Sequence, residues 1–287
     1  MFIIVSLINF TTLNCTMMEI MKYSFNWIIF ITLSIVVIGC QRSSEAGADE
    51  IVINGKLTNA TGKMIWLSEY DTHTMHVIDS VRVENDELFN FRIKVQEAGF
   101  YMISTRNNDF AILIGNKGET IKLTGDATNL SFTWQAKGSE ETQPYLEYWK
   151  NTRQQLKRVD SLIFIFRSSH LIPEFMATRI KLDSIFNSIM ERQREAATHF
   201  VNKNPGSLGS LLVIDAKFSK IPLFNEVRDI NYFKLVDSSL IKHYPGNKLA
   251  IDFHKRVQQI AKRIKNHPNN NRVLPPGELN PSYSPNH

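Results

Sequence analysis

The stretch that decides the fold is LFNFRIKV, residues 88–95. From Phe89 to Val95 an aromatic or aliphatic side chain at every odd position alternates with a polar side chain at the next one. Successive side chains of a β-strand point to opposite faces of the sheet, so this pattern predicts a strand with one buried and one solvated face. Such alternation is typical of antiparallel sheets and argues against a parallel sheet that is buried on both faces.

Short segments of similar texture lie on both sides of this strand, from Ile51 to Trp134. Turn signals separate them, and one of these, Asn116-Lys117-Gly118, predicts a hairpin that leads into Thr120-Ile121-Lys122-Leu123. Asn54-Gly55 inside the first strand indicates a β-bulge. About eight short strands of this kind predict an antiparallel β-sandwich or barrel-like domain over residues 51–136.

From Ser139 onward the apolar residues recur at helical spacing, which predicts an all-helical region over residues 137–265 and an α+β fold class for the chain. Ser139 followed by Glu140 and Glu141 predicts a helix start, with a capping hydroxyl and acids in the first turn. Further helices are expected from about Glu226 to Ile241 and from Lys248 to Lys265, and Ser207 is expected to cap a short helix over 208–214. Residues 266–287 are polar and rich in proline, and we expect a disordered tail there.

The beginning of the chain predicts an export signal. A basic residue, Lys22, precedes an apolar run over residues 27–38, which at about a dozen residues is short for a bilayer core that takes roughly 20. The run ends in Val37-Ile38-Gly39-Cys40, which resembles the bacterial lipobox, in which the cysteine is lipidated and the signal peptide is cut just before it. We therefore expect residues 1–40 to be a signal peptide, Cys40 to be lipidated, and residues 41–50 to form a flexible tether.

The chain has two cysteines, Cys15 and Cys40. The mature domain after Cys40 has no thiol, which excludes an internal disulfide, a thiolate metal site and a Cys-x-x-Cys redox pair. Residues 1–20 are also apolar, and we expect that translation starts at Met21, or at Met17 or Met18. An uncleaved membrane anchor with an incidental cysteine is the alternative.

The charge is divided between the two halves of the chain. Residues 41–149 carry 10 Lys/Arg and 16 Asp/Glu, whereas residues 150–287 carry 22 and 11. We interpret the basic half as solvated helix faces and expect no nucleic-acid partner. Lys255-Arg256 and Lys262-Arg263 are interpreted as a solvated stripe, with docking on anionic lipid or an acidic partner as the alternative.

Few residues invite a catalytic or metal-binding interpretation. His73 and His76 would point to opposite faces of a strand, and no third ligand is obvious. Ser207 lies in GSLGS, residues 206–210, which is shifted from the Gly-x-Ser-x-Gly nucleophile motif and lacks a preceding strand. The glycines at 115 and 118 join two strands and precede no helix, so they do not form a phosphate-binding loop. We expect no catalytic residue, no cofactor and no metal.

Short motifs follow one another along the chain in a set order. They are Ile53-Asn54-Gly55-Lys56-Leu57, Ile78-Asp79-Ser80, Leu88-Phe89-Asn90-Phe91, Tyr101, Gly118-Glu119-Thr120-Ile121, Gly125-Asp126, Lys137-Gly138-Ser139-Glu140, Phe200, Asn204-Pro205-Gly206-Ser207 and Tyr244-Pro245-Gly246-Asn247. This order resembles the N-terminal region of secreted thioredoxin-like thiol:disulfide oxidoreductase lipoproteins. In that family a lipobox is followed by a β-rich domain of unknown function, a helical spacer and a thioredoxin fold. The resemblance covers about residues 40–280.

The segment LPPGELNPSY, residues 274–283, is similar to the family linker that leads into the thioredoxin domain. The redox domain itself does not follow here, so no catalytic residue of the family can be transferred to this chain. The resemblance implies a non-catalytic binding or scaffold module in the cell envelope of a Gram-negative bacterium, periplasmic or at the outer membrane. It would be anchored through Cys40 and have a protein partner, such as a separately encoded thioredoxin-like protein. The alternative is a truncated or split part of an oxidoreductase acting in envelope redox homeostasis.

Overall fold

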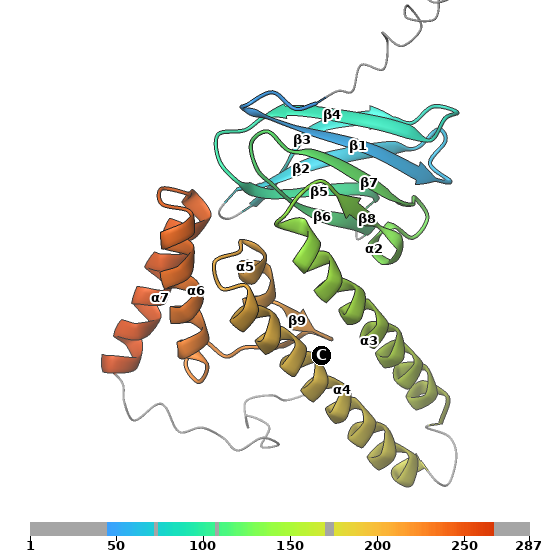
Figure 1. The fold of residues 1–287 in the computed structure, drawn as a ribbon. Helices are drawn as coiled ribbons and strands as arrows, with labels where there is room; N and C mark the ends of the chain where they lie inside the picture. Colours follow the sequence, from blue (N-terminus) through green and yellow to red (C-terminus); the bar gives the residue numbers. More distant parts are fainter. Residues whose placement is uncertain (1–44, 72–73, 107–108, 170–174, 267–287) are drawn as a thin grey trace, which may run out of the picture. The chain divides into compact units, whose positions relative to one another are not determined.

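The computed structural model describes residues 45–71, 74–106, 109–169 and 175–266. Its N-terminal part contains two four-stranded sheets (Figure 1). In hydrogen-bonded order, sheet A comprises β4 (Leu88–Lys94), β1 (Glu50–Thr58), β7 (Thr120–Asp126) and β8 (Gln135–Lys137). Sheet B comprises β3 (Thr74–Arg82), β2 (Met64–Asp71), β5 (Gly99–Arg106) and β6 (Asp109–Gly115). A helical region follows, so the predicted α+β fold class is confirmed.

The two sheets share one hydrophobic core. Ile53 and Phe91 of sheet A, and Leu67 and Ile103 of sheet B, are at most 1% exposed. Fully burying an aliphatic or aromatic side chain of this size stabilises the fold by roughly 1.5–3 kcal/mol. The alternation that begins at Leu88 is also present in the structure, because buried and exposed residues alternate along the first half of β4.

The predicted bulge at Asn54-Gly55 is wrong. β1 pairs with β4 in continuous register through Asn54 and Gly55, with Gly55 opposite Phe89. Glycine is required there because the ring of Phe89 covers the backbone: a Cβ on Gly55 would lie 1.9 Å from Cζ of Phe89. A register shift occurs instead in β2, between Leu67 and Ser68.

The predicted hairpin at Asn116-Lys117-Gly118 is a turn, but not a hairpin within one sheet. Gly118 has a φ of +78°, which glycine adopts without strain. The turn passes from β6 in sheet B to β7 in sheet A, where β7 pairs with β1 in parallel orientation. The backbone N–H of Gly118 donates to the carbonyl of Glu50 at 2.8 Å, which holds the turn at the start of β1. The sequence therefore predicted the turn at Gly118, but not that the next strand joins the other sheet.

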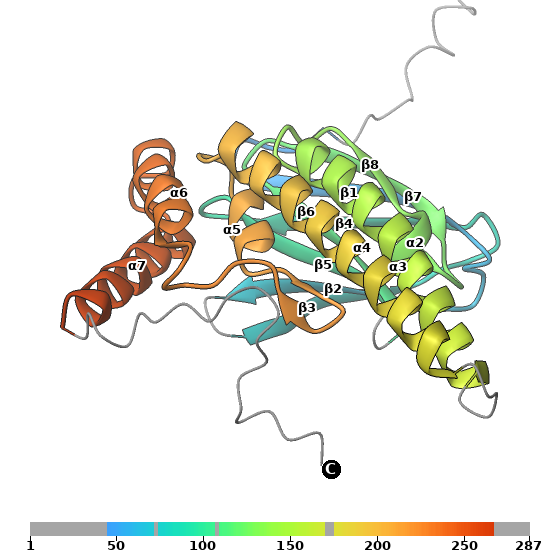
Figure 2. The same cartoon turned by 90° about the horizontal axis from the view of Figure 1, so that it is seen from below.

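The helical region contains two pairs of longer helices. After β7, and apart from β8 of sheet A, the described elements are α2 (Leu130–Thr133), α3 (Thr142–Ser169), α4 (Phe175–Lys203), α5 (Gly209–Ile214), β9 (Lys217–Phe218), β10 (Ile221–Pro222), α6 (Ile230–His243) and α7 (Lys248–Asn266). α3 and α4 lie side by side in both views (Figures 1 and 2). α6 and α7 pack through Phe233 and Phe253, whose stacked rings have centroids 6.1 Å apart. The helix expected from about Glu226 begins later, at Ile230, because Asn225 and Asp229 organise turns before it.

The first long helix is tied directly to sheet B. The backbone N–H of Thr142 donates to Oγ of Ser139 at 3.2 Å, so the predicted helix-starting role of Ser139 is confirmed. The hydroxyl of Ser139 donates to the carbonyl of Ile114, and Oγ1 of Thr142 accepts from the N–H of Ile114. Both hydroxyls are buried, and they satisfy the polar backbone at the end of β6. In the part of the chain that the structure describes, no helix is long and apolar enough to cross a membrane.

Candidate functional site

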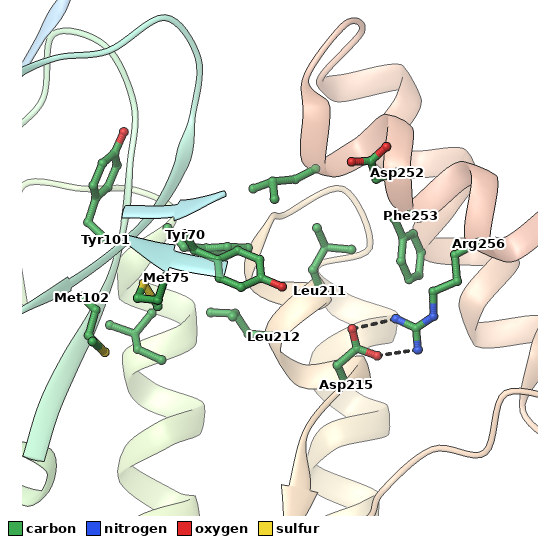
Figure 3. Close-up of a pocket in the computed structure, with 13 residues that line it drawn as sticks. Tyr70, Met75, Tyr101, Met102, Leu211, Leu212, Asp215, Asp252, Phe253 and Arg256 are labelled. Carbon is green, nitrogen blue, oxygen red and sulfur yellow. Dashed lines mark hydrogen bonds and ion pairs between the residues drawn. The ribbon is translucent and has the colours of Figure 1, made fainter. Parts of the chain in front are cut away.

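An apolar cavity of about 560 Å³ lies between sheet B and the helices α5 and α7 (Figure 3). We call it the groove. Its lining residues are Tyr70, Met75, Phe100, Tyr101, Met102, Ile112, Leu211, Leu212, Asp215, Leu249, Asp252, Phe253 and Arg256. The volume falls within the range of roughly 300–1,000 Å³ that is typical of small-molecule sites.

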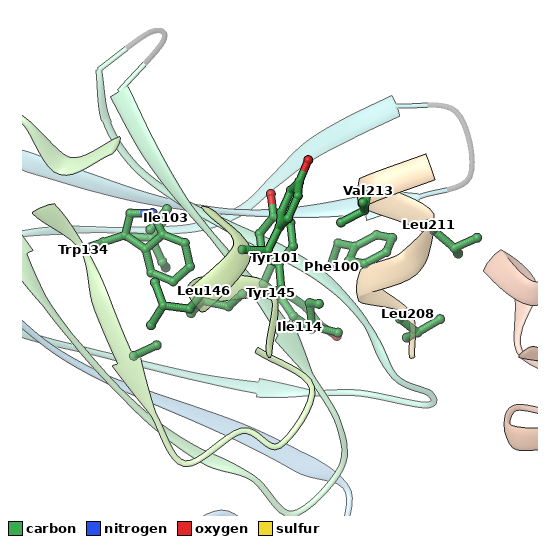
Figure 4. Packing of buried hydrophobic residues seen from close by; sticks show 14 of the residues in the cluster. Phe100, Tyr101, Ile103, Ile114, Trp134, Tyr145, Leu146, Leu208, Leu211 and Val213 are labelled. Carbon is green, nitrogen blue, oxygen red and sulfur yellow. The ribbon is translucent and has the colours of Figure 1, made fainter. Parts of the chain in front are cut away.

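Sheet B supplies one wall because β5 and β6 carry apolar residues on both faces. Tyr101 and Ile103 are buried in the core between the sheets. Met102, which points to the opposite face of β5, pairs with Ile112 of β6, and both are only partly buried. Phe100, also on the outer face, is buried against α5, which carries Leu211 and Val213 (Figure 4).

The opposite wall is positioned by polar contacts at the start of α7. The side-chain amide of Asn247 donates to the carbonyl of Ala98 at 2.8 Å, immediately before β5. Oδ1 of Asn247 also accepts from the N–H of Ala250, so the same residue caps the first turn of the helix. The placement of Leu249 and Phe253 relative to sheet B therefore depends on Asn247.

An ion-pair network closes the polar side of the groove. Arg256 donates through Nη1 to Asp215 at 2.8 Å and through Nε to Glu226 at 3.0 Å (Figure 3). The hydrogen bond with Asp215 raises the pKa of Arg256 above its ordinary value, although burial opposes this. Arg256 therefore stays charged and paired while it links α7 to the end of α5.

The lining of the groove is mainly apolar. The thirteen described residues that line it include no serine, cysteine, histidine or lysine. Two of them are methionines, whose flexible and polarisable side chains adapt to apolar ligands of different shapes. The guanidinium of Arg256 pairs with Asp215, whereas Asp252 pairs with Lys255, which does not line the groove.

A second polar cluster lies around Glu141. The sequence predicted that Glu141 stabilises the start of a helix, but the structure gives it different contacts. α3 begins at Thr142 and has no acid in its first turn. The carboxylate of Glu141 instead accepts from Oγ of Ser207 at 2.5 Å, from the N–H of Leu208 at 3.0 Å and from the hydroxyl of Tyr244 at 2.8 Å. Burial, followed by this hydrogen bond, raises the pKa of Tyr244. The explanation of Glu141 by the helix dipole is therefore wrong.

Ser207 was predicted to cap α5, and this is only partly correct. Leu208 occupies the N-cap position of the helix. Oγ of Ser207 accepts from the N–H of Gly209 at 3.0 Å while its own proton points to Glu141. The hydroxyl therefore organises the turn between α4 and α5.

The remaining candidate site residues that the structure describes do not line the groove, apart from Arg256. Cys40 and His73 lie outside the described residues. His76 is 2.6 Å from Oγ1 of Thr74, and the described ranges contain no group of three His, Cys, Asp or Glu side chains that could hold a metal ion. Lys255, Lys262 and Arg263 of the predicted stripe are exposed, and Arg263 pairs with Glu226 at the surface. Arg256 is only half-exposed and pairs with Glu226 and Asp215, so the solvated-stripe interpretation is incomplete for this residue.

The groove was missed because its residues come from distant parts of the sequence. One signal was nonetheless present: FYMI at 100–103 and FAILI at 110–114 are continuous apolar runs, unlike the alternating strand at 88–95. A continuous apolar run indicates a strand that is covered on both faces. Here the cover over the outer face comes from α5 and α7.

Comparison with known proteins identifies one region. Residues 51–145 match the family model described as Domain of unknown function (DUF4369). The match runs from β1 to the first residues of α3, and it includes the sheet B wall of the groove but not α5 or α7. No curated protein matches the chain.

Proposed function

We propose that the chain with this DUF4369 domain is an exported, lipid-anchored and non-catalytic binding module. Its groove holds an apolar side chain or short apolar segment of a protein partner in the cell envelope. The observation that carries the proposal is the groove itself, an apolar cavity of about 560 Å³ whose charged side chains are already engaged in ion pairs.

The edge of sheet B supports a peptide segment as the ligand. β3 is an edge strand, and Val77 and Ile78 on it are 63% and 42% exposed. Met75, on the same strand, lines the groove. An extended segment that pairs with an edge strand gains main-chain hydrogen bonds and places alternate side chains into neighbouring pockets. A partner strand along β3 would therefore combine backbone pairing with insertion into the groove.

The location and the class of partner follow from the sequence signals. The lipobox at Val37–Cys40 supports export and attachment through Cys40 to the periplasmic or outer-membrane side of a Gram-negative envelope. The resemblance to the accessory half of thioredoxin-like oxidoreductases supports a thioredoxin-like partner. Two of the resembling motifs, around Ser207 and Tyr244, meet at Glu141, so they act together in the fold.

Site-specific photo-crosslinking in intact cells tests the proposal. A benzoylphenylalanine at Met75, in the full-length chain, is expected to form an adduct with a partner protein. Met102→Trp fills the groove and should reduce the adduct at least about tenfold, which corresponds to 1.4 kcal/mol. Leu88→Trp is the matched control, because Leu88 is 50% exposed on β4 and does not line the groove.

The control should retain the adduct, and both variants should unfold at the same urea concentration as the parent. An adduct that survives Met102→Trp, or no protein adduct at all, would contradict the proposed use of the groove. Mass spectrometry of the adduct identifies the partner and shows directly whether it has a thioredoxin-like sequence.

A further inference from the structure

Large apolar side chains are exposed at one end of the α3–α4 pair. We call residues 160–169 and 175–183 the hairpin end. Phe164 is 71% exposed and Ile180 is 67% exposed. The exposed apolar set is Ile163, Phe164, Ile165, Phe166, Met176 and Ile180. A patch of this kind on a folded protein indicates a contact with a membrane or another molecule.

The directions of these side chains indicate whether a membrane or another protein covers them. Consecutive positions of an α-helix are about 100° apart, so the four side chains from Ile163 to Phe166 point in four directions around the axis of α3. Phe166 faces α4, where its ring lies 5.5 Å from that of Phe175, but it is still 42% exposed. A flat protein surface or a second copy of the helix would cover only one side of α3. A fluid apolar medium can cover every side of α3 that α4 leaves exposed.

The charges around the hairpin end fit such a medium when its surface is anionic. Arg158, Arg167, Arg179 and Lys181 are exposed. The exposed acids in the same part of the described structure are Asp160 and Asp183, and Asp183 lies 3.7 Å from Arg179 in a surface ion pair. Long basic side chains can lay their methylene groups along an apolar layer and keep their charges at the level of lipid phosphates. Each basic residue close to an anionic membrane surface adds to binding.

We propose that the hairpin end lies in the interfacial layer of an anionic phospholipid bilayer. The apolar side chains from Ile163 to Phe166, with Met176 and Ile180, reach the upper acyl region. The arginines and Lys181 contact the phosphates. This contact is independent of the groove and of lipidation at Cys40, and it gives the domain a second point of attachment.

Photo-crosslinking in intact cells tests the contact in the full-length chain. Benzoylphenylalanine at Phe164 is a small change at a largely exposed position, and its adducts can be identified by mass. We expect covalent phospholipid adducts at Phe164, and at least about tenfold fewer at Lys117, an exposed control position in the β6–β7 turn.

Charge reversal supplies the second measurement. The double substitution Arg179→Glu and Lys181→Glu should reduce the phospholipid adduct at Phe164 about tenfold. The matched double substitution Lys122→Glu and Lys137→Glu on β7 and β8 should leave it unchanged, and circular dichroism shows that each variant is folded. A dominant adduct with a protein or a second copy, equal lipid labelling at Lys117, or no effect of the α4 reversals would overturn the proposal.

Discussion

Replacing Glu141 with alanine should lower the free energy of unfolding of this protein substantially. Its carboxylate accepts three hydrogen bonds from two turns that are distant in sequence, one between α4 and α5 and one between α6 and α7. In the alanine variant the hydroxyls of Ser207 and Tyr244 and the N–H of Leu208 all lose this acceptor. Both turns would then lose these hydrogen bonds to the residue that precedes α3.

The magnitude follows from the three contacts. A hydrogen bond to a charged group contributes roughly 1.5–3 kcal/mol, which gives an upper limit of roughly 4.5–9 kcal/mol for three. Glu141 is half-buried, so water can replace part of what is lost, and we expect a decrease of about 3 kcal/mol in the free energy of unfolding. For a folded region of this size the corresponding decrease in Tm is about 6–12 °C.

Urea unfolding of the detergent-solubilised chain, followed by tryptophan fluorescence, measures this loss. The matched control is Glu140→Ala, because Glu140 is the preceding acid and is exposed. It should change the free energy of unfolding by less than about 0.5 kcal/mol. Glu141→Gln should be intermediate, since an amide oxygen still accepts but the charge is lost. The reasoning is refuted if the two alanine variants differ by less than about 0.5 kcal/mol.

Three further predictions address the core, the pH dependence and the anchor. Gly55→Ala should lower the free energy of unfolding by about 1–3 kcal/mol in the same assay, because the ring of Phe89 must move; an unchanged value would contradict the close approach. Burial opposes ionisation of Asp229, but hydrogen bonds led by that from Arg194 hold the pKa of Asp229 below its ordinary value of 3.8. The contribution of ionised Asp229 to the free energy of unfolding should therefore be complete above about pH 4 and be lost as the pH falls through the lowered pKa. Asp229→Asn should lower the free energy of unfolding at pH 7 and much less at about pH 2. An equal decrease at the two pH values would contradict this. Cys40→Ser should abolish labelling by a fatty-acid probe, and a wild-type peptide that reads through Cys40 with a free thiol would refute lipidation.

The sequence predicted the local elements well because their causes are local. The alternation from Phe89 to Val95 and the helical spacing after Ser139 reflect which face of each element is buried. The cap at Ser139 and the glycine at 118 likewise depend on neighbouring backbone geometry. These features required no knowledge of which elements meet in space.

The polar contacts and the sheet order could not be found in the same way. Glu141 meets Ser207 and Tyr244, which lie 66 and 103 positions further along the chain, so its neighbours in sequence gave no indication of its partners. The turn at Gly118 does not encode whether the next strand joins sheet A or sheet B. The groove was indicated only indirectly, by apolar runs in β5 and β6, because its other wall comes from α5 and α7.

The central position of β1 in sheet A affects how this protein can be made. β1 is the first strand of the domain, but its two neighbours are β4 and β7, and β7 begins only at Thr120. During synthesis, both edges of β1 can be paired only after most of the domain, up to β7, has been made. Contacts between residues far apart in sequence slow folding. A nascent chain that stops before β7 would leave the apolar segment Ile51–Ile53 with one open edge, and such chains should depend on chaperones and be removed by proteases.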